Sequence, residues 1–462
     1  MKSPPEKSSG IIFVIVYLSF FLDNVLLTVV VPIIPDYLFS NEIKMKANIT
    51  TYHSVTSLSP LQRKYESIDS ENGVLGALLA SKAFVQLLFT PFVGYAVTKV
   101  GCYLPMLLGS CNILLASLLF AYGKSYGLLV LARALHGSSS AAVSVSGMSL
   151  LAKHVPVELR PKLMPVAFGG IALGVLLGYP FGGAVYQHLG KQAPFILISL
   201  VISMNIGLQL NLINRFSSEE EDDTEECISD DLELINLLKD KKTMIASGAI
   251  CISTTTMAVL EPCVPLWLMG HFHPAPPRWI LGAVFIPDSI GYFLGSHFGG
   301  LLPIEGWRVG LTAMLIGGLS SCGLSSATTI PQLFLPHFGI GLSVGLVDAI
   351  LVPYLATIID NRGSSKYGSV YTLQQLAVSL AYSFGPLLGG EAVNLIGFSW
   401  LMKIIGLLNV MFSPLLLELE KSSNQKEGMV LLRNESDTGS MYSSLREELS
   451  NIDSLESNRT EE

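Results

Sequence analysis

The chain has 462 residues, of which 50% are hydrophobic and only 14% are charged, whereas about a quarter of the residues in an average soluble domain are charged. This composition excludes a single water-soluble core, because apolar stretches of about 20 residues, long enough to cross a bilayer, recur along most of the sequence. The formal net charge of −8 comes mainly from two acidic polar segments and therefore says little about nucleic acid.

The first apolar stretch, 11–38, is too long for the hydrophobic region of a signal peptide and has no small-residue cleavage site. We therefore expect a retained first membrane span. Eleven more apolar stretches follow, so the sequence predicts an all-α polytopic membrane protein with twelve transmembrane helices in two sets of six. The later spans lie near 73–97, 102–123, 125–152, 161–187, 193–214, 243–270, 277–302, 307–325, 331–359, 367–392 and 395–417.

The loops predict the orientation of the chain. An even number of spans places both termini on one side, and the short loops on that side hold more lysine and arginine than the opposite loops, as cytosolic loops do. The N-terminal segment 1–10, the linker 215–242 and the tail 418–462 are then cytosolic, and the loop 40–72 is lumenal. In this loop Asn48 begins an Asn-Ile-Thr sequence, a possible glycosylation site that would make the chain a glycoprotein.

The two six-helix halves, 11–214 and 243–417, resemble each other. The acidic linker between them has too little apolar surface to fold, so we expect it to be unstructured. Small residues at one-turn spacing let helices approach closely, and an internal duplication favours a transporter over a receptor or a channel. Ordinary small-residue packing is the alternative for each segment taken singly. The matched glycines are Gly178, Gly182, Gly183 and Gly190 in the first half and Gly385, Gly389, Gly390 and Gly397 in the second.

We single out five ionisable residues inside the predicted spans. Placing a charge inside a membrane costs free energy, so such residues are functional candidates by default. If three carboxylates and a lysine face one cavity, we expect them to bind a cation and exchange it for protons. The exchange arises because one carboxylate cannot hold a cation and a proton at the same time. The alternative is that each charge pairs with another and only orients helices. The five are Asp23, Lys82, Arg133, Glu261 and Asp348, in spans one, two, four, seven and ten.

Aromatic residues accompany these charges, and a ring face attracts an ammonium group. Packing and anchoring at the membrane interface are the alternative roles of such rings. The candidates are Trp267, Tyr354, Tyr371 and Tyr382.

Six ordered blocks of the sequence resemble the vesicular amine transporter family, and above all the vesicular monoamine transporters. The resemblance implies a major facilitator fold, proton-driven loading of amines from the cytosol into acidic vesicles such as synaptic vesicles, and a central site between the halves. The blocks are LDNVLLTVVVPIIPDYL from Leu22, ASKAFVQLLFTPFVG from Ala80, GKQAPF from Gly190, AVLEPCVPLW from Ala258, GLVD from Gly345 and YGSVY from Tyr367.

The resemblance also implies roles for individual residues. It places the amine-recognising carboxylates on Asp23 and Glu261, with Asn24 adjoining, and aromatic positions near the ligand cavity on Tyr371 and Tyr382. The proton-coupling and gating positions are Asp348, Lys82 and the cytosolic-side Arg160, and we group Arg133 of span four with them.

The chain also departs from the family pattern. Gln375 stands where the family has an acid that pairs with the span-two lysine, so Lys82 is expected either to lose its proton or to turn to Asp23. His136 stands where the family has a glutamine, and Thr254 replaces an asparagine. We infer a divergent member, for which a substrate other than catecholamines, indoleamines and histamine stays open.

The tail 418–462 is acidic and predicted to be disordered. It contains Glu427, Leu431 and Leu432 in an acidic-dileucine pattern of the kind that clathrin adaptors bind during vesicle sorting.

These observations predict a proton-coupled antiporter that loads small organic cations, monoamines first, into acidic vesicles. An acetylcholine-type carrier, a broader organic-cation or drug antiporter of the same fold, and a non-transporting membrane scaffold or sorting protein are the alternatives. An enzyme is not expected, because no P-loop, nucleophile elbow, HExxH or CxxC pattern is present. The proton gradient replaces any cofactor, and the six cysteines have no metal-ligand spacing.

Overall fold

The computed structural model describes residues 10–30, 33, 60–224, 233–271, 280, 283–363 and 366–419. Within these ranges it leaves out the side chains of 60–77, 79–80, 214–224, 233, 262, 265–266, 269–271, 391 and 394. Residues up to Pro414 form one compact unit, and those from Leu415 form a second. Asn48 and the dileucine pattern lie outside the described residues.

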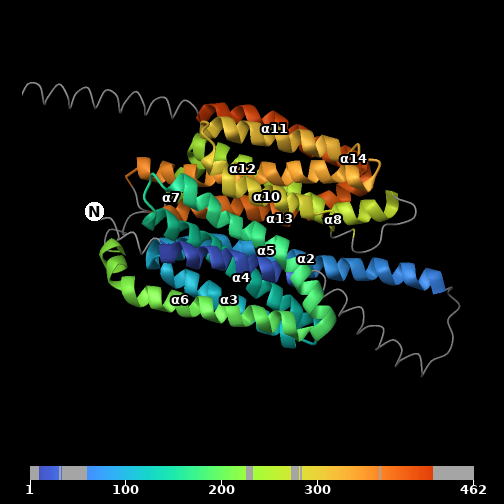
Figure 1. The fold of residues 1–462 in the computed structure, drawn as a ribbon, viewed down its shortest axis with the longest axis horizontal. Coiled ribbons are helices and arrows are strands. Elements are labelled where there is room, and N and C mark those ends of the chain that lie inside the picture. The colour runs from blue at the N-terminus through green and yellow to red at the C-terminus, as the bar shows by residue number, and fades with distance from the viewer. Residues whose placement is uncertain are drawn as a thin grey trace, which may run out of the picture. The chain divides into compact units, whose positions relative to one another are not determined.

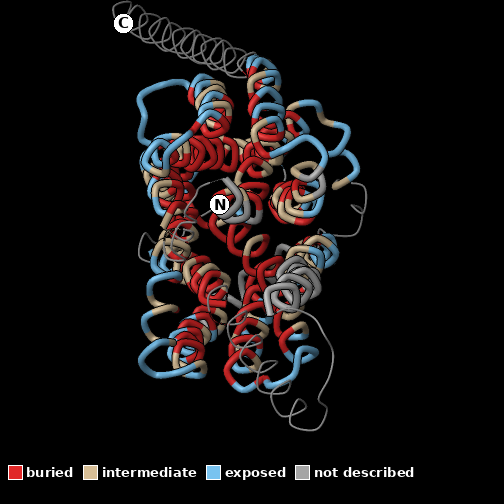
Figure 2. Tube along the Cα trace, turned by 90° about the vertical axis from the view of Figure 1, so that its right-hand side faces the viewer, coloured by how far each residue is buried: buried red, intermediate tan, exposed pale blue. Residues whose placement is uncertain are grey.

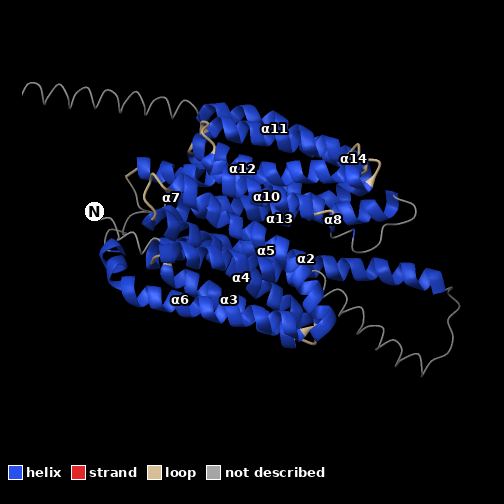
Figure 3. Ribbon diagram, in the orientation of Figure 1, coloured by secondary structure: helices blue, strands red, loops and turns tan. Residues whose placement is uncertain are grey.

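The described part of the chain is helical and contains no strand (Figure 3). A helix satisfies its own backbone hydrogen bonds, as a segment inside a bilayer must. Nine of the described helices are long and apolar enough to cross a membrane. The first half comprises a first helix, Gly10–Val30, then α2 (Pro60–Val100), α3 (Tyr103–Tyr122), α4 (Tyr126–His154), α5 (Arg160–Leu189) and α6 (Gln192–Thr224).

The second half follows a short helix, α7 (Glu233–Lys239), and its order along the chain is visible in the colours of Figure 1. Short 3-10 turns, η1 (Gly299–Leu301), η2 (Ile330–Leu333) and η3 (Ser413–Leu416), lie at helix ends. The longer helices are α8 (Lys241–His271), α10 (Ile286–Phe298), α11 (Gly306–Leu324), α12 (Phe334–Asn361), α13 (Tyr367–Ile396) and α14 (Phe398–Phe412).

The distribution of side chains is that of a membrane protein. Bulky apolar residues lie outside, with Leu335 79% and Phe92 72% exposed, while many serines, threonines and charged groups are buried. Figure 2 shows buried segments on the inside of the helix assembly and exposed ones on its outer faces. A surface of this kind is stable against lipid and would expose a large apolar area to water. Each half also has its own apolar core, around Phe120 and Phe195 in the first and around Met402 in the second.

The repeated glycines allow the same close helix packing in the two halves. A Cβ added at Gly182 of α5 would lie 3.1 Å from Val29 Cα of the first helix, and one at Gly389 of α13 would lie 3.1 Å from Val259 Cγ1 of α8. Gly190 and Gly397 end α5 and α13, both with a φ of 82°, which favours glycine. The matched spacing therefore corresponds to matched packing, as expected for an internal duplication.

A pair of neighbouring glycines tests this packing. Gly182→Val should lower the stability of the folded protein by about 1–3 kcal/mol, because the added side chain is forced against Val29. Gly183→Val is the matched control, since a Cβ at Gly183 meets nothing within 4 Å. Thermal unfolding of the purified protein in detergent measures both, and an equal loss at the two positions would contradict the packing role.

The two halves meet mainly along two helix pairs, α2 with α13 and α5 with α10, with further contacts of α4 with α13 and of α5 with α12. In a chain of two six-helix repeats, α2 corresponds to α10 and α5 corresponds to α13. The two pairs are therefore the same contact made twice, which is the arrangement that lets repeats rock against each other around a central site.

Two segments differ from the sequence-based expectation. The segment 40–72, expected to be a loop, is helical from Pro60, where α2 begins. The linker 215–242, expected to be unstructured, is helical through Thr224 and again in α7. A local reason for α7 is that its Leu237 is fully buried. The next helix, α8, begins directly after it, where the Asp240 carboxylate accepts a hydrogen bond from the backbone N–H of Thr243 and caps α8.

Candidate functional site

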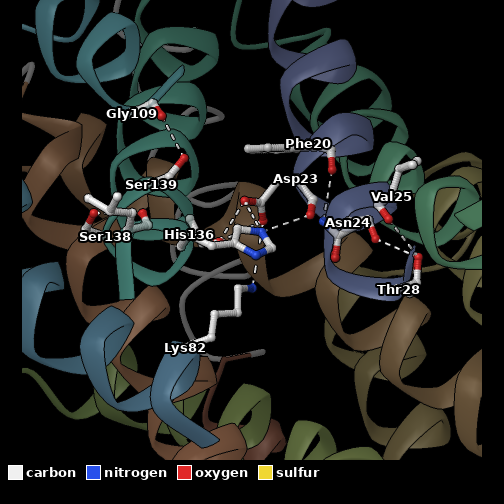
Figure 4. Close-up of polar contacts among 12 residues, drawn as sticks. Phe20, Asp23, Asn24, Val25, Thr28, Lys82, Gly109, His136, Ser138 and Ser139 are labelled. Atoms are coloured by element: carbon white, nitrogen blue, oxygen red, sulfur yellow. Dashed lines mark hydrogen bonds and ion pairs between the residues drawn. The ribbon is translucent and has the colours of Figure 1, made fainter. Parts of the chain in front are cut away.

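Asp23, inside the first helix, is the centre of a buried polar cluster within the first half (Figure 4). The hydroxyl of Ser140 donates to both carboxylate oxygens, at 2.7 and 2.9 Å. His136 Nε2 lies 3.2 Å from Asp23 Oδ1, and Lys82 Nζ lies 3.9 Å from Oδ2. Helices α2 and α4 supply these three partners, so the cluster depends on the packing of both against the first helix.

The Lys82 contact settles one expectation from the sequence. Gln375 offers no charge to Lys82, and its amide donates to Ser379 Oγ at 3.4 Å. Of the two outcomes expected for the lysine, the structure has the one in which it turns to Asp23.

The second half contributes a group of carboxylates. Asp348 of α12 is buried and accepts a hydrogen bond from the Tyr292 hydroxyl at 3.0 Å. Glu261 of α8 is exposed, although Leu260 and Cys263 beside it are buried. Tyr382 lies within electrostatic reach of both acids. These side chains come from α8, α10, α12 and α13 and form an acidic and phenolic cluster.

Asp288 of α10 belongs to the same group and was missed in the sequence analysis. It is 2% exposed, and its Oδ1 has no hydrogen-bond partner among the described residues. It interacts electrostatically with Glu261. Asp288 lies inside the predicted span 277–302, so the rule that flags charged residues in membrane spans was sufficient to find it.

Glu261 and Lys82 link the two clusters, because they are close enough to interact electrostatically although they belong to different halves. Arg133 of α4 also reaches Glu261. Its side chain is 1% exposed, and its Nε and Nη1 have no hydrogen-bond partner within the described part of the chain. Buried Arg133 and largely buried Lys82 therefore approach the acidic cluster from the first half, and the exposed Glu261 interacts with both of them and with Asp288.

A separate group, around Arg160, joins the halves at one end of the first unit. Arg160 Nη1 lies 2.6 Å from Asp360 Oδ2, and its Nη2 donates to the Tyr367 hydroxyl at 3.0 Å. The guanidinium also lies over the Tyr367 ring, 5.0 Å from the ring centre. Since Arg160 begins α5 and its partners lie on α12 and α13, this contact closes that end between the halves.

The remaining predicted residues divide between these groups. Tyr371 is fully buried, its hydroxyl contacts Met164 Sδ at 3.8 Å, and it interacts with Arg160. It therefore belongs to the closed end and not to the carboxylate clusters. Asn24 donates to the Phe20 carbonyl within its own helix and packs against Gly174 of α5, so it does not join the Asp23 cluster.

Comparison with known sequences identifies relatives over almost the whole chain. The profile of the Major Facilitator Superfamily matches residues 12–226. The human synaptic vesicular amine transporter is 34% identical over 478 residues, covering 92% of this chain and 91% of the relative. The chromaffin granule amine transporter of Rattus norvegicus is 32% identical, covering 94% and 92%. The vesicular acetylcholine transporter of Tetronarce californica is 32% identical, covering 92% and 84%.

The chain belongs to the vesicular amine transporter family. The relatives named here are transporters and not enzymes. Solved structures confirm the major facilitator fold that the resemblance implied. The human organic anion transporter MFSD10 superimposes with a TM-score of 0.66 at 16% identity, covering 89% of this chain and 100% of that one. The proton:xylose symporter XylE gives 0.65 at 14% identity, covering 89% and 96%.

As a member of the vesicular amine transporter family, the chain is a multi-pass membrane transporter of a small molecule. Within the family fold, its charged residues fall into the three groups described above, one in each half and one that joins them. The first group surrounds Asp23, the second contains Asp288 and Asp348, and the third pairs Arg160 with Asp360 across the halves.

Proposed function

We propose that the protein loads small organic cations, monoamines first, from the cytosol into acidic vesicles in exchange for protons, by alternating access. The proposal rests on two carboxylates from opposite halves that share a cationic partner. Asp23 pairs with Lys82, and Glu261 interacts with both Lys82 and Arg133. An ammonium group that enters between the halves can displace the lysine from Asp23, because both compete for one carboxylate. The proton gradient supplies the driving force, and no cofactor is required.

Alternating access follows from the closed end at Arg160. With both termini in the cytosol, as the loop charges predict, this end faces the cytosol, and its closure shuts the space between the halves off from the cytosol. In the closed state the Arg160 and Asp360 charges stabilise each other, and the Tyr367 hydroxyl donates a hydrogen bond to Asp360. Opening requires that these charges separate into water, which is a two-state change of the kind that gates transporters.

The cellular setting is part of the same proposal. We expect a secretory or synaptic vesicle membrane, a glycan at Asn48 in the lumen, and a clathrin adaptor bound at Glu427, Leu431 and Leu432. The names of the relatives, which are transporters of synaptic vesicles and chromaffin granules, support the vesicle membrane.

Uptake into acidified vesicles tests the function. A panel of radiolabelled amines is offered to vesicles that carry the protein, with and without a protonophore. We expect at least one amine to accumulate and the accumulation to collapse when the protonophore is added. If no amine accumulates although the protein reaches vesicles, the antiporter proposal fails for that panel and the non-transporting scaffold is favoured.

A carrier of quaternary ammonium compounds is a second candidate, because relatives named as vesicular acetylcholine transporters are 32% identical over most of the chain. A quaternary cation has no proton to lose and binds through charge and ring faces alone. Including acetylcholine in the panel separates the two, since a monoamine carrier accumulates serotonin in preference to acetylcholine and an acetylcholine carrier does the reverse. A broader organic-cation antiporter accumulates both.

Asp288 gives a further test of the acidic cluster. Asp288→Asn should lower uptake by about 10-fold to 150-fold, which is the loss expected for one charge-assisted contact of about 1.5–3 kcal/mol. Asp360→Asn is not a suitable control, because it changes the closed end, so Glu305→Gln is used instead. Glu305 is exposed and pairs with Arg308 three residues later. Equal uptake by Asp288→Asn and the unmodified protein would remove Asp288 from the site.

A further inference from the structure

His136 is a buried titratable group in direct contact with Asp23. Its side chain is fully buried, and its Nε2 lies 3.2 Å from both Asp23 Oδ1 and the Asp23 backbone carbonyl. In Figure 4 its ring lies against Asp23, on the side from which Lys82 also approaches. A histidine that only filled space in α4 would not need two contacts to the same acidic residue.

The contacts decide which ring nitrogen carries the proton. Both atoms beside Nε2 are acceptors, so Nε2 is the protonated nitrogen of the neutral ring. Nδ1 then holds a free lone pair, and it has no hydrogen-bond partner among the described residues. A second proton adds at Nδ1 without breaking the bond to Asp23. Protonation places a positive charge on a ring that already donates to the Asp23 carboxylate, so the hydrogen bond becomes an ion pair.

The charged groups that face this ring are few. Asp23 comes from the first helix, Lys82 from α2 and Arg133 from α4 itself. Helix α3, which packs against α4, contains no charged residue, and the only charged residue of α13 is Glu391, which lies four turns from Gln375 by sequence. Among the described residues, Asp23 is therefore the acid that stabilises a charged ring, while Lys82 and Arg133 oppose it.

We propose that His136 is a proton site of the exchange, which acts on the transported cation through Asp23. The inference rests on the proposed function and deepens it. On the acidic side a proton from the lumen adds to Nδ1, and the imidazolium then competes with the bound ammonium group for Asp23. On the cytosolic side the same proton leaves Nδ1, and Asp23 becomes available to the next cation. No covalent bond other than N–H forms or breaks.

The first experiment measures the ring itself and needs no substrate. The full-length protein is labelled with ¹⁵N-histidine and studied by NMR in detergent, and the signal absent from His136→Gln is assigned to His136. We expect this ring to change charge between pH 5 and pH 8, the range in which imidazoles titrate. In Asp23→Asn the charged His136 ring loses the acid that stabilises it, so the midpoint of its titration should move to lower pH. A signal that does not titrate in this range, or that is unaffected by Asp23→Asn, overturns the proposal.

The second experiment counts protons in transport. In His136→Gln an amide still donates to Asp23 but cannot bind a proton. The slope of the logarithm of serotonin accumulation against the imposed pH difference should therefore fall by about one, which is about a tenfold lower accumulation for each pH unit. His337→Gln is the matched control, since His337 is also fully buried but bonds only the Leu333 carbonyl among described residues.

The outcomes separate the inference from the function on which it rests. If the unmodified protein accumulates serotonin and His136→Gln keeps the same slope, the proton role of His136 is wrong while the antiporter stands. If the unmodified protein accumulates no serotonin, the monoamine function fails, and the NMR titration still decides whether His136 and Asp23 share a proton. A merely structural histidine would lower the amount of active protein without changing the slope.

Discussion

Asp23→Asn is expected to reduce proton-driven amine uptake to the background of empty vesicles. The carboxylate is the partner of Lys82, His136 and Ser140 at once, and an amide cannot hold either a cation or a proton in its place. Removing it also leaves Lys82 without its acid in a site where only 12% of the lysine side chain is exposed. Losing one partner of a buried ion pair costs about 3–5 kcal/mol, so the folded protein should be less stable as well.

A double variant separates transport from folding. In Asp23→Asn combined with Lys82→Gln, no unpaired charge remains between the two positions, and stability should return toward that of the unmodified protein. Uptake should not return, because the cation still lacks its carboxylate. Thermal unfolding and radiolabelled uptake are measured on the same preparations. Uptake restored together with stability would show that Asp23 only supports the fold.

Arg160→Gln is expected to open the end of the protein that Arg160 closes. The arginine pairs with Asp360 and Tyr367 across the halves, and a glutamine is shorter and carries no charge. A loss of about 2–3 kcal/mol from the closed state shifts the population of open molecules by about 30-fold to 150-fold. Concentrative uptake should fall when the closed state is destabilised, because an end that does not close lets the cation leak back.

Thiol labelling measures the opening directly. Met164 is fully buried beside Tyr371 in the closed state, so a Met164→Cys reporter in a background without the six native cysteines should react slowly with an impermeant maleimide. Arg160→Gln should speed this reaction by at least tenfold. Arg308→Gln is the control, since Arg308 forms an exposed pair with Glu305 inside the second half. An unchanged labelling rate in Arg160→Gln would assign closure of this end to other contacts.

The membrane fold could be predicted from the sequence because the bilayer imposes it. Every span needs about 20 apolar residues, and every backbone group inside the membrane must be satisfied within its own helix. The sequence-based prediction was wrong in two segments between the spans, where the bilayer does not impose a structure. Helix α2 begins at Pro60, in a segment expected to be a loop, and α7 forms in a segment expected to be unstructured. Outside the apolar spans, a single buried side chain such as Leu237 of α7 can stabilise a helix, and the overall composition of a segment does not reveal it.

The candidate site was predicted unevenly. Charge inside a span identified Asp23, Glu261 and Asp348, because burying an ionisable group is costly whatever its neighbours are. The same rule applied to Asp288, which was passed over. Tyr371 was expected near the ligand and lies instead beside Arg160. Sequence position does not tell at which depth of a helix assembly a ring will lie.

The sequence by itself determined the helical membrane class, the duplicated halves and the costly charges, since each follows from the period, length and polarity of single segments. Only the tertiary structure decided which of these charges meet. The contact of Asp23 with Lys82 and His136, the approach of Glu261 from the other half and the closure at Arg160 join residues from 59 to more than 200 positions apart. Such contacts depend on how helices pack, and the packing is set by small residues and side-chain shapes that no single segment contains.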